Sequence, residues 1–350
     1  MEGNGRGQRA TIDDVAARAG VSIKTVSRVV NNEPNVRDAT RDKVRAAIAD
    51  LNYYPNASAR RLAGNRSFLF ALVYDDPSAY PDASANYVTN LHGGALKAAR
   101  EAGYDLLIHP CDYQSSGLLE ELDQLIDHSR IDGLILAPPL AEVKPVVRML
   151  RKLGKPFVRV SPGKVQGYDA VHTNDREICV AMMRYLVSLG HERIAFIRGH
   201  EDHKAIGDRE RGYEDGLREA GLPLRSSLVL QGNNSFDSGV ACGARLLQRK
   251  RRPTAIFAAN DDMAAGVLHQ ALEMEIPVPD ELSVAGFDDV SLAQHVFPTL
   301  TTIHQPVKQM AERATKLLFE AIVGKPRKER TLVESTLVIR ESTGPAPSER

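Results

Sequence analysis

The stretch with the clearest chemical character is Thr11–Val30, TIDDVAARAGVSIKTVSRVV, near the amino terminus. Its second half carries hydroxyl, ammonium, guanidinium and amide groups at helical spacing, and all of these can hydrogen-bond to base edges or phosphates. The set consists of Ser22, Ile23, Lys24, Thr25, Ser27, Arg28 and Asn31. Such side chains suit a nucleic-acid surface and would make a poor protein core. The alternative interpretation is an ordinary helical hairpin with a solvated polar face.

Two short helices around a tight turn must position these side chains. Thr11 can cap the first helix, with Asp14 at the capping-box spacing, and Gly20 can end it, because glycine tolerates the left-handed conformation. Ser22 can cap the second helix, whose valines then face the first. A third helix is expected over Asp38–Leu51. The pattern predicts a helix-turn-helix, in a bundle too small to be more than marginally stable alone.

The head of the chain resembles that of the lactose-repressor (LacI/GalR) family of bacterial transcription regulators. The resemblance rests on the run V-S-x-x-T-V-S-R-V-x-N at residues 21–31, followed by N-Y-x-P-N and L-A, and it extends over almost the whole chain. It implies a homodimer that places each second helix in a major groove of a pseudo-palindromic operator. Lys24 could then read guanine and Ile23 a thymine methyl, while Thr40 and Tyr53 join the hydroxyl residues in contacting phosphates.

After Pro55, Asn56 can cap a short helix over Ala57–Leu62, and the resemblance implies that this is a hinge helix within a hinge and linker at 56–66. Isolated segments this short do not stay helical in water, and in the family this one orders on DNA and enters the minor groove as a pair. Leu62 matches the family leucine that wedges into the central base step, with Ala59 beside it. An apolar wedge of this kind unstacks a base step and kinks the duplex.

The charge of the chain is divided unevenly along its 350 residues. Residues 1–66 hold 12 Lys+Arg and 7 Asp+Glu, a net of +5, and the remainder holds 33 and 38, a net of −5. A basic head on an acidic body suits one part that meets phosphates and one that does not. The 43% apolar content is that of a soluble globular protein.

From Ser67 the pattern changes to strands that alternate with amphipathic helices, which predicts parallel sheets covered on both faces. The strand candidates are Phe68–Tyr74, Leu106–His109, Gly133–Leu136, Phe157–Val160, Ile194–Ile197, Leu228–Leu230, Ala255–Ala258, Ser283–Ala285 and Thr301–Ile303. The resemblance implies that they form a two-lobed core like that of periplasmic sugar-binding proteins. The fold class is thus α/β: an all-α head and hinge helix, then two doubly wound lobes.

The expected domains are a disordered lead-in at 1–9, the head at 10–55, the hinge and linker at 56–66, the core at 67–340 and a polar tail at 341–350. A last strand is expected over Leu332–Ile339. No leucine heptads follow it, so a dimer is expected rather than a coiled-coil tetramer.

The resemblance also places effector contacts at strand ends, where ligands of such sheets bind. The candidates are Asp75, Asp76, Pro138, Arg159, Arg209, Phe236, Asn260, Asp261, Asp288 and Gln305. Several relatives carry an acidic residue where Arg159 stands, so the chain departs from the family pattern there. Phe236 is included as an aromatic surface for a sugar ring, although Asn234 stands where a relative has its aromatic residue. Taken singly, Asn260 could simply cap the following helix.

Carboxylates, an amide and guanidinium groups together predict a ligand rich in hydroxyls, because each hydroxyl both donates and accepts a hydrogen bond. A sugar is therefore the expected effector. Two arginines could also bind a sugar phosphate or sugar acid, and a purine or a protein corepressor is a further alternative. The family resemblance implies that the ligand alters the angle between the lobes and hence operator affinity. Release of DNA is the commoner case, and the sequence leaves the direction open.

Other function classes find less support. No nucleophile elbow, phosphate-cradling glycine loop or metal cluster is visible, so neither an enzyme nor a cofactor is expected. The four histidines His109, His172, His191 and His200 are dispersed and are expected to be structural or on the surface.

The expected location is the bacterial cytoplasm, in association with the nucleoid. Three scattered cysteines, Cys111, Cys179 and Cys242, argue against disulfides and zinc. The first residues lack the apolar core of a signal peptide, and no apolar run approaches the ~18 residues of a membrane span. A transport-type sugar-binding protein would explain the body but not residues 11–64.

Overall fold

The structure, a computed structural model, describes residues 10–30, 36–53, 66–76, 85–162, 170–202, 204–325 and 330–347. The chain divides into two compact units, the head Met1–Phe68 and the body Leu69–Arg350. Asn31, Ala59 and Leu62 lie outside the described residues, as does most of the expected hinge helix, so the roles given to them stay predictions.

The described part of the head forms three helices, α1 (Ile12–Ala19), α2 (Ile23–Val30) and α3 (Asp38–Asp50). The expected capping box is present: the Asp14 N–H donates to Thr11 Oγ1 over 3.3 Å, and the Thr11 N–H donates to Asp14 Oδ2 over 2.8 Å. Gly20 ends α1 with a φ of 66°.

A small apolar core joins the three helices of the head. Val15, Val26 and Val44 are fully buried, and Ala10, Val21 and other small side chains pack around them. The ring of Tyr53 belongs to this core, with 9% of its surface exposed. Any phosphate contact by Tyr53 is therefore restricted to its hydroxyl, and that role stays a prediction.

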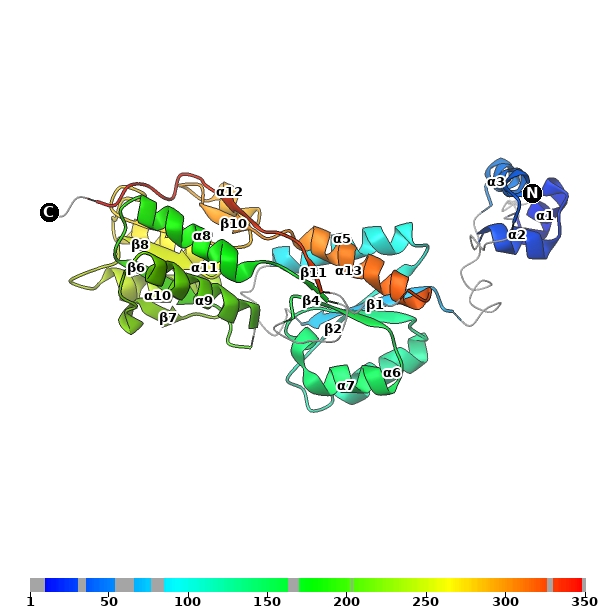
Figure 1. The fold of residues 1–350 in the computed structure, drawn as a ribbon, viewed down its shortest axis with the longest axis horizontal. Helices are drawn as coiled ribbons and strands as arrows, with labels where there is room; N and C mark the ends of the chain where they lie inside the picture. The colour runs from blue at the N-terminus through cyan, green and yellow to red at the C-terminus, as the bar shows by residue number, and fades with distance from the viewer. Residues whose placement is uncertain are drawn as a thin grey trace, which may run out of the picture. The chain divides into compact units, whose positions relative to one another are not determined.

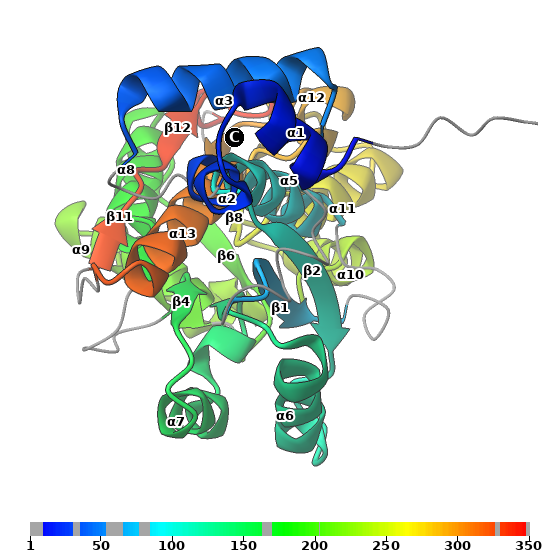
Figure 2. The ribbon, with the colours of Figure 1, turned by 90° about the vertical axis from the view of Figure 1, so that its right-hand side faces the viewer.

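The first lobe of the body, lobe 1, is built on a parallel sheet with the strand order β11-β5-β4-β3-β1-β2. Its strands are β1 (Leu69–Asp75), β2 (Asp105–Cys111), β3 (Gly133–Leu136), β4 (Phe157–Val160), β5 (Ala170–His172) and β11 (Arg330–Leu332). The helices are α5 (Ala85–Glu101) and α13 (Val307–Ile322), which cover one face, and α6 (Leu118–Ser129) and α7 (Lys144–Lys152), which cover the other (Figure 2). A 3₁₀ turn, Leu140–Glu142, follows β3.

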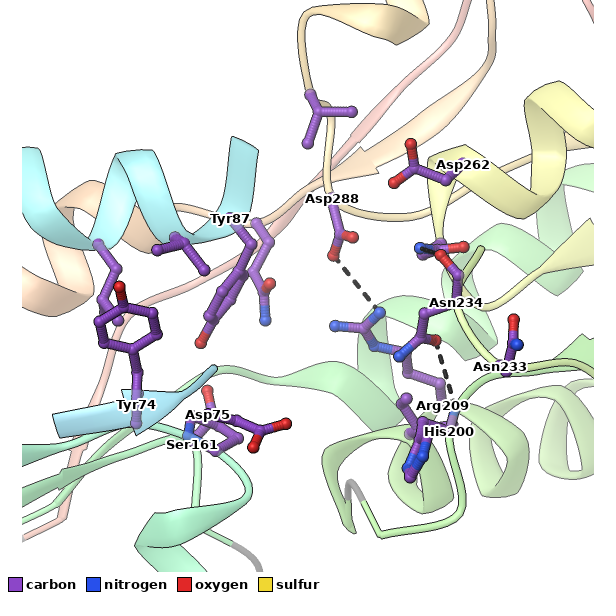
Figure 3. A pocket seen from close by; sticks show the side chains of 18 of the residues that line it. Tyr74, Asp75, Tyr87, Ser161, His200, Arg209, Asn233, Asn234, Asp262 and Asp288 are labelled. Atoms are coloured by element: carbon purple, nitrogen blue, oxygen red, sulfur yellow. Dashed lines mark hydrogen bonds and ion pairs between the residues drawn. The ribbon is translucent and has the colours of Figure 1, made fainter. Parts of the chain in front are cut away.

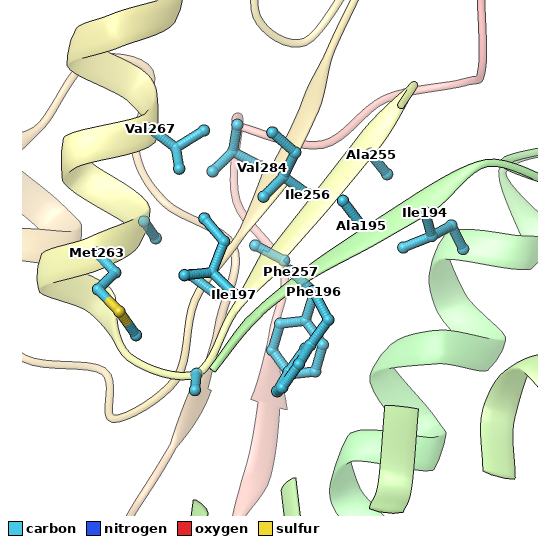
Figure 4. Packing of buried hydrophobic residues seen from close by; sticks show 14 of the residues in the cluster. Ile194, Ala195, Phe196, Ile197, Ala255, Ile256, Phe257, Met263, Val267 and Val284 are labelled. Atoms are coloured by element: carbon cyan, nitrogen blue, oxygen red, sulfur yellow. The ribbon is translucent and has the colours of Figure 1, made fainter. Parts of the chain in front are cut away.

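Lobe 2 has a parallel sheet in the order β7-β6-β8-β9. Its strands are β6 (Ile194–Arg198), β7 (Val229–Gln231), β8 (Ala255–Ala258) and β9 (Ser283–Ala285). Helices α8 (Asp175–Ser188) and α9 (Lys204–Glu219) pair on one face, and α10 (Phe236–Leu247) and α11 (Asp261–Glu273) pair on the other. The sheet core is fully buried and includes Phe196 and Phe257, whose ring centroids lie 5.4 Å apart (Figure 4). A short helix, α12 (Leu292–His295), and an antiparallel pair, β10 (Thr302–His304) and β12 (Thr336–Val338), complete this lobe.

Three described segments cross between the lobes, from β5 to α8, from β10 to α13 and from β11 to β12 (Figure 1). The expected single strand Leu332–Ile339 is therefore wrong: it is divided into β11 and β12, which belong to different lobes, because the chain crosses between them. The expected polar tail also differs, since Ser342–Gly344 is buried and the Ala346 N–H donates to the Leu189 carbonyl over 2.8 Å.

None of the described helices combines the length and the apolar character that crossing a membrane requires.

Candidate functional site

A cavity of about 170 Å³ lies between the two lobes, at the carboxyl ends of the strands. An ordered water needs roughly 10–15 Å³ counted in the same way, so the cavity can hold a ligand with on the order of ten non-hydrogen atoms. Figure 3 shows the two walls facing each other, with Tyr74, Asp75, Tyr87 and Ser161 from lobe 1 on one side. The lobe 2 wall consists of His200, Ile206, Arg209, Asn233, Asn234, Asn260, Asp262, Asp288 and Val290.

Arg209, from α9, is the central charged group of the lobe 2 wall. It is 6% exposed, and its Nε donates to Asp175 Oδ2 over 3.1 Å. Its Nη1 donates to the Ala259 carbonyl over 2.5 Å and lies 3.4 Å from Asp288 Oδ1. The guanidinium also stacks on Phe287, 3.5 Å from the ring centroid. Burial would lower the pKa of Arg209, but the carboxylates of Asp288 and Asp175 raise it overall, so the side chain is a fixed cation.

Asp288 follows β9 and is held in an unusual backbone conformation, with a φ of 111°. Its N–H donates to the Ile303 carbonyl over 2.8 Å, which fixes this conformation. Non-glycine residues at such φ are uncommon and cluster at functional sites. Burial raises the pKa of Asp288 to about 7, although the Arg209 charge acts in the opposite direction. The carboxyl can therefore either accept or donate a hydrogen bond near neutral pH.

The three residues after β8, Asn260, Asp261 and Asp262, have different roles. Asn260 caps α11, where its Oδ1 accepts from the Met263 N–H over 3.0 Å, and it lines the cavity as well. Asn260 is therefore a helix cap, and its expected contact with an effector stays a prediction. Asp261 was expected in the site but is fully buried, and its carboxylate accepts from the Val290 N–H and from Thr302 Oγ1. Asp262 lines the cavity instead.

The lobe 1 wall carries polar groups that the protein itself does not fully satisfy. Within the described residues, the buried hydroxyls of Tyr87 and Ser161 have only each other as hydrogen-bonding neighbours. The Oε1 of Gln305, in the segment that crosses from β10 to α13, makes no hydrogen bond there. Burial raises the pKa of Asp75 to about 6, despite two backbone N–H groups that hydrogen-bond to its carboxylate. Buried polar groups without partners are costly, so these atoms indicate where a polar ligand would bind.

A hydrogen-bonded bridge spans the lobes beside the cavity. Tyr113, from the loop after β2, donates its hydroxyl proton to Asp202 Oδ2 of lobe 2 over 2.5 Å. Gln114 Nε2 donates to the same oxygen over 3.3 Å. The Asp202 N–H in turn donates to Nδ1 of His200 over 3.3 Å. Tyr113 and His200 both line the cavity, so the bridge is continuous with the ligand-facing surface.

The structure brings most of the predicted effector residues to this cavity, but not all of them. Those that line it are Asp75, Pro138, Arg209, Asn260, Asp288 and Gln305. Asp76 is not among the lining residues; its N–H donates to the Cys111 carbonyl over 3.1 Å. Arg159 lies inside β4, is 1% exposed and donates to the Ala141 carbonyl over 3.1 Å. It was wrongly placed because Ser161, after the strand end, is the residue that reaches the cavity.

Phe236 is a further correction. Its ring is partly exposed, with its centroid 5.6 Å from that of His269, and it is not part of the cavity wall. Asn234, two residues earlier, lines the cavity with a φ of 71°. Its Oδ1 accepts from the His200 N–H over 3.3 Å, in a space that exists only because residue 199 is glycine.

Several lining residues were missed by the sequence reasoning. They are Tyr74, Tyr87, Tyr113, Ser161, His200, Asn233 and Asp262. Ser161, His200 and Asn233 each follow a strand by one or two residues, so a strict search of every strand end would have found them. His200 was expected to be structural or on the surface, whereas it faces the cavity. Tyr87 lies on α5, and only the three-dimensional fold reveals its position.

The head presents the side chains expected to meet DNA. Ser22, Ile23, Lys24 and Arg28 are exposed, with Ile23 at 48%, and Thr25, Ser27 and Thr40 are half-buried. Ser22 caps α2 as expected, since the Thr25 N–H donates to its Oγ over 3.2 Å. The exposed residues occupy the face of α2 opposite its buried valines, which leaves them available to a groove of DNA.

Comparisons with known proteins match both the head and the body. A family model described as bacterial regulatory proteins, lacI family, matches residues 11–56, and a periplasmic binding protein-like domain matches residues 183–343. The HTH-type transcriptional regulator DegA of Bacillus subtilis (strain 168) is 34% identical over 342 residues, 96% of this chain and 99% of the relative. The HTH-type transcriptional repressor PurR of Erwinia tasmaniensis is 34% identical over 344 residues, 97% and 98% of the two chains.

Solved structures give the same result. A transcriptional regulator CelR–cellobiose complex has a TM-score of 0.73 at 32% identity and covers 95% of this chain and 100% of its own. The Lac repressor dimer bound to operator and the anti-inducer ONPF has a TM-score of 0.77 at 26% identity and covers 96% and 100%. Because relatives above 30% identity match over nearly their whole length, the chain belongs to the LacI family of bacterial DNA-binding transcriptional regulators.

Proposed function

We propose that the protein is a repressor that binds a pseudo-palindromic operator as a homodimer and leaves it when an uncharged sugar binds between the lobes. We infer an uncharged ligand from the balance of charge among the residues that line the cavity. Three lining carboxylates, Asp75, Asp262 and Asp288, face one lining guanidinium, that of Arg209. Arg209 is already held by Asp288 and Asp175.

This balance disfavours an anionic ligand. A phosphate or sugar acid would need a cation with free hydrogen-bonding capacity, and the second arginine expected in the site, Arg159, lies elsewhere in lobe 1. The buried hydroxyls of Tyr87 and Ser161, the amides of Asn233 and Gln305 and the carboxylates together offer the donors and acceptors that a polyol requires. The cellobiose in the related CelR complex supports a sugar.

A purine is the second candidate. Tyrosine rings can stack on a base, and the amides of Asn233, Asn234 and Asn260 can pair with its polar edge. The tyrosines also suit the apolar face of a sugar, so the aromatic residues do not separate the two classes.

The proposed mechanism follows from the position of the cavity. A ligand that contacts both walls binds the closed arrangement of the lobes more tightly than the open one, and it shifts the equilibrium by that difference in affinity. The crossing segments would transmit this shift to the partner subunit and to the hinges. The Lac repressor dimer bound to operator supports the dimeric DNA complex.

The test is a titration of the protein–DNA complex, on an operator selected from a random-sequence duplex library. Glucose, cellobiose, glucose 6-phosphate, gluconate and hypoxanthine serve as ligands. A neutral sugar should lower operator affinity and the two anions should not. A response to glucose 6-phosphate or gluconate alone would refute the argument from charge. Specific binding that appears only after a cell lysate is added would indicate a protein corepressor.

Lys24→Ala tests the DNA face. We expect operator binding to weaken by about 1–3 kcal/mol. The preference for one base over the others should be lost only at the base pair that Lys24 reads. Lys43→Ala, which removes another exposed lysine of the head from α3, is the matched control and should leave base preference unchanged. Affinity measured on operator variants and on random DNA decides the question. An equal loss on both kinds of DNA would assign Lys24 to phosphates.

A further inference from the structure

Cationic side chains gather on lobe 2 at the amino ends of its strands, away from the effector cavity. Arg193 directly precedes β6, and the segment QRKRRP at residues 248–253 comes just before β8. The first residues of these strands, Ile194 and Ala255, are register partners and lie together in Figure 4. We name this surface the distal basic patch, which consists of Arg193, Arg225, Arg249, Lys250 and Arg251.

The fold holds these charges together against their mutual repulsion. Arg193 Nε donates to the Arg251 carbonyl over 2.8 Å, and the Thr254 N–H donates to the Arg193 carbonyl over 2.9 Å. Burial lowers the pKa of Arg193, and the nearby charges of Arg225, Arg249 and Arg251 lower it further. Arg225, Lys250 and Arg251 are exposed. Hydrogen bonds to the backbone therefore hold these like charges close together.

The patch differs from the other arginine-rich surface of lobe 2. On α8 and α9, Arg184, Arg211 and Arg218 form ion pairs with carboxylates of the same lobe. Among the described residues, no ion pair joins a patch side chain to a carboxylate; Arg252, beside the patch, is the one that pairs, with Glu281. The patch thus offers positive charge that the lobe does not neutralise itself.

We propose that the distal basic patch binds the phosphate backbone of a second segment of duplex DNA. Arginine suits phosphate because its planar fork donates two parallel hydrogen bonds. The exposed hydroxyls of Ser226 and Ser227, which follow Arg225, can add phosphate contacts. The protein already acts on DNA, so duplex is the polyanion within its reach. A subunit would then hold two duplex segments, one at the head and one at lobe 2.

An acidic protein fits the surface less well. Protein interfaces are anchored by buried aromatic and apolar side chains at their centre. Among the described residues, only one large exposed hydrophobic side chain, that of Leu224, is adjacent in sequence to the patch. Backbone binding of DNA needs charge and no such anchor.

The first experiment uses the full chain with a weakened head, K24A/R28A, and a 30-base-pair duplex of random sequence. We expect residual binding whose logarithm falls with the logarithm of KCl concentration with a slope of about −2 to −3, as for roughly three phosphate contacts. Adding R225Q/K250Q/R251Q should abolish this binding. Adding R184Q/R211Q/R218Q, which removes the same charge from the paired surface of the same lobe, should leave it unchanged. Thermal unfolding confirms that each variant is folded.

The second experiment mixes donor-labelled and acceptor-labelled duplexes with the protein carrying an intact head. Energy transfer between the duplexes should appear with the unaltered chain, disappear with R225Q/K250Q/R251Q and persist with R184Q/R211Q/R218Q. Residual binding and transfer that survive the patch substitutions would overturn the proposal, and so would an equal loss in the control. Neither experiment depends on the effector, so failure here leaves the proposed ligand response untouched.

Discussion

The two walls of the cavity are built on different principles. In lobe 2, Arg209, Asn260 and Asp288 are held by partners of their own lobe, in ion pairs, a helix cap and a strained turn. In lobe 1, Tyr87 and Ser161 bring buried hydroxyls whose only hydrogen-bonding neighbours within the described residues are each other. The lobe 2 wall is thus organised before the ligand arrives, while the lobe 1 wall gains its partners from the ligand. This difference suggests that the ligand docks on lobe 2 first and that lobe 1 closes over it.

Arg209→Ala should give the largest effect, because it removes the charge that the lobe 2 wall is built around. Asp175 and Asp288 would be left buried without their cation, and breaking a buried pair in this way costs about 3–5 kcal/mol. We expect both lower stability in urea unfolding and loss of the ligand response. Arg211→Ala, on the same helix but exposed, should alter neither. If Arg209→Ala left ligand affinity unchanged, the proposed difference between the two walls would be wrong.

Tyr87→Phe should have a smaller effect and a different character. The lost hydroxyl has only that of Ser161 as a hydrogen-bonding neighbour within the described residues, so the free energy of unfolding should fall little. Ligand affinity should drop by the value of one hydrogen bond, about 0.5–1.5 kcal/mol, or roughly 2- to 10-fold. Calorimetric titration and urea unfolding of the same samples separate the two quantities. Equal losses in ligand affinity and in the free energy of unfolding would show that Tyr87 stabilises the fold as the lobe 2 residues do.

A third expected effect is a pH dependence of the free energy of unfolding that comes from Asp288. Its pKa rises from an ordinary 3.8 in the unfolded chain to about 7 in the folded protein. The native state then holds more protons between these values, so stability should fall as pH rises from 4 to 7 and change little from this group above that. Asp288→Asn should flatten the decline of the unfolding midpoint between pH 4 and 7. Asp123→Asn, on the surface of α6, is the control, and a slope unaltered by Asp288→Asn would contradict the assignment.

The sequence predicted the head and the alternating body well, because both depend on local patterns. The capping box at Thr11 and the strands Gly133–Leu136 and Ala255–Ala258 appear as expected. Strand β5 was missed, and β11 and β12 were merged into one strand, because these short strands beside the crossings between lobes are defined by the strands that they pair with.

Local pattern identified site residues where a polar residue ends or follows a strand, whereas Arg209, on α9, was identified through the family resemblance. Asp75, Asn260 and Asp288 obey that rule. Arg159 failed because position within a strand, rather than residue type, decides which side chain reaches the cavity. Tyr87 was missed because it comes from a helix, where no local pattern distinguishes a cavity-facing tyrosine from a core one.

The hydrogen bond from Tyr113 to Asp202 has a consequence for how long the ligand-bound state lasts. Separating the lobes at this point requires breaking two hydrogen bonds to a single carboxylate, which would slow the departure of a bound molecule. Departure is thereby slowed more than arrival, because arrival can occur while the lobes stand apart. Transcription would then respond to the recent history of the ligand as well as to its momentary concentration.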